Sequence, residues 1–213
     1  DEYHLYTLER STTLHDRETK QVEFIRASNV KSKSLYVYDG AQIDYSDAYS
    51  ARNNKEYGTQ SNKKIWVMRE FVNSEDNHLG IALPNGSIRF FRRGDDKQLE
   101  FTGENAIDHT PKDETVSVYT GNAFDITGER KQTEFKIDNG RNWLDESFEI
   151  KLRNHKTEKA EIKTVEHLYR GANWEITKAS GKYKKKDSKT IEFTVLAAPD
   201  KEEIITYTVH YTW

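Results

Sequence analysis

Cysteine is absent from the 213 residues, and proline and methionine are scarce, with three and one respectively. Without cysteine the chain has no disulfide, no thiol nucleophile and no cysteine-based zinc site. No apolar run approaches 18 residues, so we expect no membrane span. Neither sign of charge dominates, because 33 Lys and Arg face 36 Asp and Glu for a net charge of −3. This balance gives no support to nucleic-acid binding, which usually shows as a basic excess.

Charged residues make up 32% of the chain, a fraction that is also found in disordered proteins. The aromatic content argues against disorder, since 12 Tyr, 9 Phe and 4 Trp can supply a core. A chain rich in Tyr, Thr and Val that also carries many charges is typical of antiparallel β-structure with one solvated face per strand. No amphipathic helix of respectable length and no solenoid-type repeat is found.

The carboxy-terminal third shows the clearest alternation of apolar and polar residues. Strands are predicted at 148–152, 160–168, 174–176, 190–195 and 205–213. Val165 and Leu168 break the period of two, so we expect a β-bulge there. The regular spacing predicts an immunoglobulin-like β-sandwich over 141–213, without the Cys…Trp…Cys core of antibody domains.

The first two-thirds are also predicted to be β, as an irregular antiparallel domain over 1–140. Candidate strands are 3–8, 21–26, 35–38, 64–72, 87–92, 99–102, 115–119 and 124–135. Residues 43–62 have no clean period and are expected to form a long loop. The segment 138–142 (DNGRN) is the expected domain junction, because its residues favour turns. The whole chain is therefore predicted to be all-β with antiparallel sandwich architecture.

Several ordered motifs resemble those of a known bacterial family. They are 14–22 (LHDRETKQV), 78–92 (HLGIALPNGSIRFFR), 101–104 (FTGE), 107–111 (IDHTP), 121–126 (GNAFDI), 130–135 (RKQTEF), 165–168 (VEHL), 185–193 (KKDSKTIEF) and 207–211 (YTVHY). Together they are similar to domain-of-unknown-function family 4139, the carboxy-terminal region of mucoidy-inhibitor-A-like proteins. The resemblance covers nearly the whole chain and is weakest across 43–62.

This resemblance implies a bacterial exported or lipoprotein-like protein, located in the periplasm, in the cell envelope or outside the cell. It brings no established activity, cofactor or catalytic residue, and the family label suggests only a link to exopolysaccharide. The chain opens on Asp1-Glu2-Tyr3, with neither a basic start nor an apolar stretch, so we expect a processed or excised piece without its own signal peptide.

Metal or acid–base chemistry has weak candidates. Among seven scattered histidines, His109 is the first to inspect, although a turn histidine capped by Asp108 and Thr110 is the more ordinary interpretation. Asp39, Asp44 and Asp47 cluster their oxygens as a calcium loop would, but lack the EF-hand spacing, and a solvated loop is favoured. The dipeptides 145–146 and 166–167 are interpreted as chance pairs among 36 acids. No HExxH, GxSxG or nucleotide-binding motif occurs.

Aromatic residues are the candidates for contact with a ligand. Trp66 lies in an apolar run and is predicted to be a core residue, whereas Trp143 and Trp174 are predicted to be closer to the surface. The fourth tryptophan, Trp213, could join them in a sugar-stacking platform. Tyr45, Tyr49 and Tyr57 in the irregular loop are expected to be partly exposed. The basic run 182–187 is interpreted as protection of a strand edge, with a weak hint of an anionic partner.

These patterns favour a non-catalytic β module that is structural or binds a protein partner or its own amino-terminal region. No cofactor, metal, catalytic residue, nucleic acid or membrane span is expected, and the ligand-binding residues are left unassigned. One alternative is a carbohydrate-binding module for cell-surface glycans, which predicts two or three exposed aromatics on one face. A second alternative is a hydrolase, which predicts a cleft with convergent His, Asp or Glu near 138–143.

Overall fold

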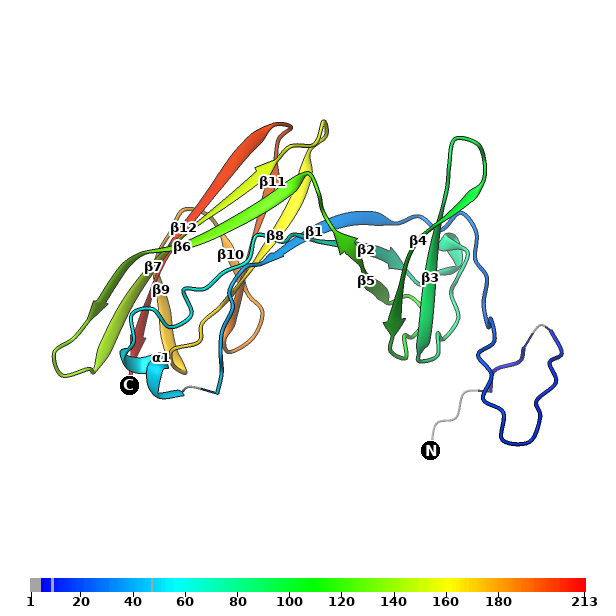
Figure 1. Cartoon of the computed structure of the whole chain (residues 1–213), viewed down its shortest axis with the longest axis horizontal. Helices are drawn as coiled ribbons and strands as arrows, with labels where there is room; N and C mark the ends of the chain where they lie inside the picture. The colour runs from blue at the N-terminus through cyan, green and yellow to red at the C-terminus, as the bar shows by residue number, and fades with distance from the viewer. Residues whose placement is uncertain (1–4, 9, 47) are drawn as a thin grey trace. The chain divides into compact units, whose positions relative to one another are not determined.

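The computed structural model describes residues 5–8, 10–46 and 48–213, apart from the side chains at 48, 49 and 52 (Figure 1). Twelve strands form in these residues: β1 (Lys33–Asp39), β2 (Trp66–Val72), β3 (Gly86–Arg93), β4 (Leu99–Ile107), β5 (Thr115–Asn122), β6 (Ile126–Ile137), β7 (Trp143–Asn154), β8 (Ala160–His167), β9 (Asn173–Ala179), β10 (Tyr183–Lys185), β11 (Thr190–Ala197) and β12 (Lys201–Thr212). The helical elements are α1 (Ala48–Asn53) and the 3-10 turn η1 (Glu75–Asn77). The all-β prediction is confirmed.

The chain divides into two compact units. Unit 1 comprises Asp1–Lys33 and Arg69–Val118, and unit 2 comprises Ser34–Met68 and Tyr119–Trp213. Strands β2 and β5 each begin in one unit and end in the other. Residues 138–142, expected to be a domain junction, form the turn between the paired strands β6 and β7 of unit 2.

Unit 2 is a sandwich of two sheets. One sheet has the order β6-β7-β12-β9 and is antiparallel throughout. The other sheet has the order β10-β11-β8-β1-β2-β5, in which β1 and β8 pair in parallel. The parallel pair joins segments far apart in the sequence, as the blue β1 and the yellow β8 of Figure 1 show. The sandwich architecture is confirmed, and the immunoglobulin-like character stays a prediction.

Alternating strands build the core of unit 2. In β7, every second residue from Leu144 to Asn154 is buried and the residues between them are half-buried. Phe148 of β7 stacks on Tyr207 of β12 at 5.4 Å between ring centroids, and Tyr207 meets Phe193 of β11 at 5.8 Å. The first contact lies within one sheet and the second joins the two sheets, as the period-two pattern predicted.

The bulge expected in β8 is not present. β8 pairs with β11 without any shift of register from Ala160 to His167. Its inward positions include Thr164 and Glu166, both fully buried, while Val165 faces outward. The prediction was wrong because it assigned the inward face by hydrophobicity, whereas two of the inward residues are polar.

Unit 1 has a smaller core under the hairpin of β3 and β4. Four residues, Phe71, Leu83, Val116 and Val118, are buried there. Two buried amides tie its loops together. Asn73 donates to the carbonyls of Ile81 and Pro111, and Asn77 donates to those of Lys31 and Val72.

Three further segments differ from their predictions. Residues 21–26 form no strand, and neither do the described residues of the candidate 3–8, whose first two residues lie outside the described part. Residues 43–62 contain the short helix α1, followed by turns, in place of a wholly irregular loop. In the part of the chain that the structure describes, no helix is long and apolar enough to cross a membrane.

Candidate functional site

A shallow hollow of about 290 Å³ lies in unit 2, where β1 and β8 end and β2 begins. Its lining residues come from these three strands and from the loop after β1: Asp39, Ala41, Ile43, Tyr45, Asn62, Trp66 and His167. The hollow combines a carboxylate, an imidazole, an amide and two aromatic rings. A concave surface with a few convergent polar groups is the usual setting for small-molecule binding.

Strand pairing brings Asp39 and His167 together. In the parallel pair of β1 and β8, Asp39 lies opposite Val165. Val165 is two residues before His167, the last residue of β8, and the side chains of both residues are on the same face of the sheet. His167 Nε2 lies 3.0 Å and 3.1 Å from the two carboxylate oxygens of Asp39. Both side chains are about one quarter exposed. The hydrogen bond and charge of Asp39 raise the pKa of His167 and outweigh its partial burial.

Trp66 and Tyr45 supply the aromatic surface of the hollow. Trp66 is 40% exposed, and Tyr119 of β5 supports its ring edge-on at 6.4 Å between centroids. Tyr45 is 65% exposed. Partial burial, together with the nearby charge of Asp39, raises the pKa of Tyr45, so its hydroxyl stays protonated at neutral pH. Ring faces and a hydroxyl donor are thus available to a ligand.

Asn62 fixes the loop against β1. Its side-chain amide donates to the carbonyl of Asp39 at 3.0 Å, and its side-chain oxygen accepts from the backbone N–H of Lys64 at 2.9 Å. Tyr38, fully buried in β1, donates its hydroxyl to the carbonyl of Asn62. The floor of the hollow is therefore built from a rigid strand end.

Arg170 anchors the middle of the same loop from the core. Its guanidinium donates to the carbonyls of Ala51, Asn54 and Tyr57 at 2.9 to 3.0 Å. The same group forms a two-pronged ion pair with Glu146, at 2.9 Å and 2.8 Å, and both side chains are fully buried. Residues 51–57 belong to no strand, so the Arg170 guanidinium donates to backbone carbonyls that a neighbouring strand would otherwise pair with.

Arg130 makes the second buried pair behind the hollow. Its Nε donates to Glu166 at 2.8 Å, and its Nη1 donates to the carbonyl of Gly58. Tyr207 also donates to Glu166, at 2.5 Å. Burial alone would lower the pKa of Arg130, but the charge of Glu166 raises it well above its usual value. Arg130 is therefore charged, and its contact with Glu166 is structural.

The two dipeptides assigned to chance, 145–146 and 166–167, have ordered partners on both faces of their strands. Glu166 and Glu146 point inward to the buried arginines. Their neighbours point outward: His167 to Asp39, and Asp145 to His210 at 2.6 Å. Because successive side chains of a strand point to opposite faces, each dipeptide has one residue in the core and one residue at the surface.

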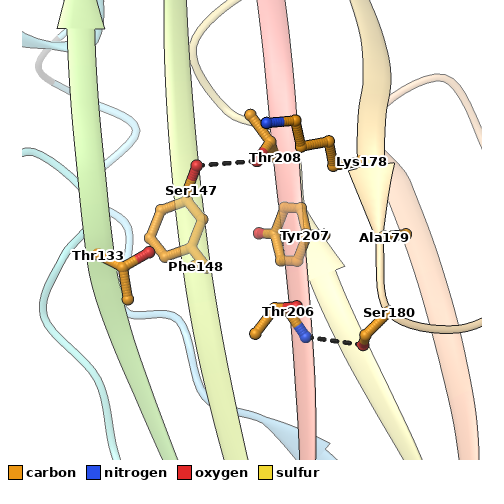
Figure 2. A pocket seen from close by; sticks show the side chains of 9 residues that line it. All are labelled: Thr133, Ser147, Phe148, Lys178, Ala179, Ser180, Thr206, Tyr207 and Thr208. Atoms are coloured by element: carbon orange, nitrogen blue, oxygen red, sulfur yellow. Dashed lines mark hydrogen bonds between the residues drawn. The ribbon is translucent and has the colours of Figure 1, made fainter.

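A second hollow, of about 230 Å³, lies on strands β6, β7, β12 and β9 (Figure 2). Hydroxyl side chains dominate its lining, and Lys178 is its one charged lining residue. Ser147 and Thr208 bond to each other at 2.8 Å, and Ser180 accepts from the backbone N–H of Thr206. This lining has hydroxyls and one lysine, whereas the first hollow adds a carboxylate, an imidazole and exposed aromatic rings, so the first hollow is the stronger candidate site.

The structure corrects two of the aromatic predictions. Trp66 is exposed and not part of the core, because Ile65 takes the inward position beside it. Tyr57, expected to be partly exposed, is buried, donates to the carbonyl of Asp44 and meets the ring of Tyr169. Tyr45 is exposed as predicted. The side chain of Tyr49 lies outside the described part.

The other tryptophans do not join Trp66 in a row. Trp143 stacks on His210 at 5.8 Å, and Trp174 lies under Lys185 and donates to the carbonyl of Ser188. These two tryptophans and Trp213 are half-buried. These tryptophans therefore do not form the predicted platform, and the exposed aromatic residues of the hollow are Trp66 and Tyr45.

The remaining candidates lie apart from the hollow or outside the described residues. His109 is an exposed residue of unit 1 that accepts from Asn85, while its own N–H donates to Asp108. Asp44 accepts two hydrogen bonds from Ser46, and Asp47 lies outside the described residues. Within the described residues, no group of three or more His, Asp or Glu could hold a metal ion. Neither hollow includes a residue of 138–143.

Sequence reasoning missed the pairing of Asp39 with His167, since 128 residues separate them and no local pattern links them. Its one local signal was Asp39-Gly40 at the end of a predicted strand. The hollow can hold a small polar ligand against an aromatic face. Comparison with protein-family models, with curated proteins and with solved structures finds no match to this chain.

Proposed function

We propose that this chain is a non-catalytic β module that binds a glycan through the hollow of Asp39, Tyr45, Trp66 and His167. The observation that carries the proposal is the exposed ring of Trp66, held beside polar groups that converge on the same hollow. A sugar ring has an apolar C–H face and a rim of hydroxyls. The aromatic ring can stack on the C–H face, and the carboxylate, the imidazole and the phenol can hydrogen-bond to the hydroxyls.

The shape of the hollow supports recognition of a surface-accessible ligand. It is shallow, and its two aromatic side chains remain 40% and 65% exposed. Such a site covers one face of a sugar and leaves both chain ends free, as binding within a polymer requires. We expect dissociation constants of about 1 mM to 1 μM for a single site of this kind.

Binding is favoured over hydrolysis by the chemistry of the lining. The hollow has a single carboxylate, Asp39, and both of its oxygens face the imidazole of His167. Glycoside hydrolysis generally needs two carboxyl groups flanking the bond. The lining also has no serine, threonine or lysine to act as a nucleophile.

The setting of the module follows from the motif resemblance. We propose membership of domain-of-unknown-function family 4139, and with it a place in the periplasm, in the cell envelope or outside a bacterial cell. A module that binds polysaccharide there would connect its own chain to the surrounding glycan layer. A protein partner, or the chain's own amino-terminal region, is the competing ligand.

Glycan-array screening followed by calorimetry tests the proposal. We expect the chain to bind at least one polysaccharide and Trp66→Ala to weaken binding at least tenfold, because the stacking surface is lost. Trp143→Ala is the matched control, since Trp143 stacks on His210 away from the hollow. Absence of binding to every glycan, or equal losses in the two variants, would contradict the proposal.

A further inference from the structure

The hollow opens onto a longer surface of the same sheet. Strand register defines a row across four neighbouring strands, in which Asp39 pairs with Val165, Val165 with Glu192, and Glu192 with Lys184. Paired residues of adjacent strands place their side chains on the same face. At about 4.8 Å per strand, Lys184 lies about 14 Å from Asp39 along this row.

A second row runs beside the first. His167 pairs with Thr190, and the backbone N–H of Lys186 bonds to the carbonyl of Thr190 at 2.9 Å. Lys186 is therefore two strands away from His167, about 10 Å. Both rows lead from the hollow to the edge strand β10.

Lysines gather at that edge. Lys182, Lys184 and Lys186 are alternate residues in and around β10, so they share a face, and all three are exposed. We call these three residues the lysine strip. Residues 178–189 hold six lysines and one acid, Asp187, in a chain whose net charge is −3. The positive charge is thus concentrated in one place.

Nearby acids leave most of this charge unpaired. Glu192 lies beside the strip, but its side chain is only 13% exposed and stands 3.9 Å from Lys186. Asp187 uses its carboxylate to accept the backbone N–H of Lys189 at 2.8 Å. The surface therefore changes from an aromatic hollow, in which Asp39 and His167 pair with each other, to a basic edge at β10.

We propose that the hollow and the lysine strip form one extended site for an acidic linear glycan. This inference rests on the proposed function and names the class of glycan. One sugar ring lies on Trp66, and acidic groups of following units meet Lys184 and Lys186. Lysine is a flexible point charge, which suits carboxylates repeated along a polymer better than one fixed geometry.

Charge and topology favour a glycan over an acidic peptide. A peptide added as a strand would bond to the outer edge of β10, which is only three residues long and faces away from the hollow. A ligand lying across the sheet face reaches both Trp66 and the lysines. A peptide paired to the outer edge of β10 would not contact Trp66.

Calorimetry with matched oligosaccharides tests this inference. The probes are linear oligogalacturonate, oligomannuronate and oligoglucuronate, each beside its neutral methyl ester. At low salt we expect one acidic form to bind about five- to thirtyfold tighter than its ester. Lys184→Gln/Lys186→Gln should abolish this preference and leave binding of the ester unchanged. Lys131→Gln/Lys159→Gln removes the same charge from exposed positions outside the strip and should keep the preference.

The outcomes separate the inference from the proposed function. Equal affinity for acid and ester, or a preference that survives the Lys184/Lys186 change, overturns the acidic-glycan inference while glycan binding stands. Competition by polyglutamate as strong as that by the acidic glycan overturns it in favour of an acidic peptide. Failure of all six probes to bind overturns the inference, and a glycan array without hits overturns the proposed function as well. Raised salt should reduce the preference in the wild-type chain and in the Lys131→Gln/Lys159→Gln control.

Discussion

Arg170 and Glu146 form a fully buried, two-pronged ion pair, and the same guanidinium donates to four carbonyls of the loop between β1 and β2. Two charges in a core are costly to desolvate, and they persist only where their hydrogen bonds are satisfied. Here the arrangement links the sandwich core to the segment that walls the candidate site. Arg170 is therefore the main anchor for the middle of the loop, while Arg130 holds Gly58 and Tyr38 holds Asn62.

Replacing Arg170 with Met should destabilise unit 2 by about 3–5 kcal/mol, because Glu146 is left buried without its counter-charge. All four tryptophans belong to unit 2, so urea unfolding followed by tryptophan fluorescence measures that unit. Arg153→Met is the control, since Arg153 pairs with Glu129 and Glu202 at the surface, and it should cause a small change. Equal losses in the two variants would refute a special role for the buried pair.

Gly128→Ala should also destabilise unit 2, by about 1–3 kcal/mol, through overpacking. A Cβ at this position would lie 2.3 Å from the ring of Tyr38, which is fully buried and cannot move aside. Gly181→Ala is the matched control, because its added Cβ would meet nothing within 4 Å. The difference between their urea midpoints measures the effect, and identical midpoints would show that Tyr38 can relax.

Protonation of His167 should stabilise unit 2. Its pKa is raised in the folded chain, so the contribution is fully present below the unfolded value near 6.5 and is lost as pH rises through the folded pKa. We expect the unfolding free energy to fall from pH 6 towards pH 8, and Asp39→Asn to flatten this dependence. A proton NMR titration of the His167 ring gives the folded pKa directly. A pKa at or below 6.5 would contradict the prediction.

Asn73→Ala should lower the unfolding free energy of unit 1 by about 1–3 kcal/mol and leave the stability of unit 2 unchanged. The buried amide satisfies the carbonyls of Ile81 and Pro111 and the N–H of Gly80, all of which lose a partner. Hydrogen exchange of amides in 69–118 reports the effect, because unit 1 has no tryptophan. Asn85→Ala, at an exposed position, is the control. Slow exchange retained in the Asn73 variant would count against the argument.

Strand content was predictable because alternation is a local property of the chain. Strands β11 and β12, and β7 between Phe148 and Leu152, follow their patterns closely, since apolar side chains occupy nearly every inward position there. β8 was misjudged at Glu166, whose inward orientation depends on Arg130 from a distant strand. An inward polar residue is predictable only when its partner is known.

The candidate site was less predictable than the fold. Trp66 was assigned to the core because its neighbours are apolar, yet period-two geometry places it opposite the buried Ile65. The contact of Asp39 with His167 depends on a parallel pairing between β1 and β8. Parallel pairing leaves no turn signal in the sequence, because the connection between the strands is long.

The position of β12 has a consequence for the order of synthesis. This strand is central in its sheet, paired to β7 on one side and β9 on the other, although it follows every other strand in the chain. During translation β7 and β9 must therefore wait with unpaired edges until residues 201–212 leave the ribosome. A ribosome that stalls before that point leaves two open edges on one nascent chain, a state that chaperones and proteases recognise. The sheet of unit 2 can therefore close only after residues 201–212 have been synthesised.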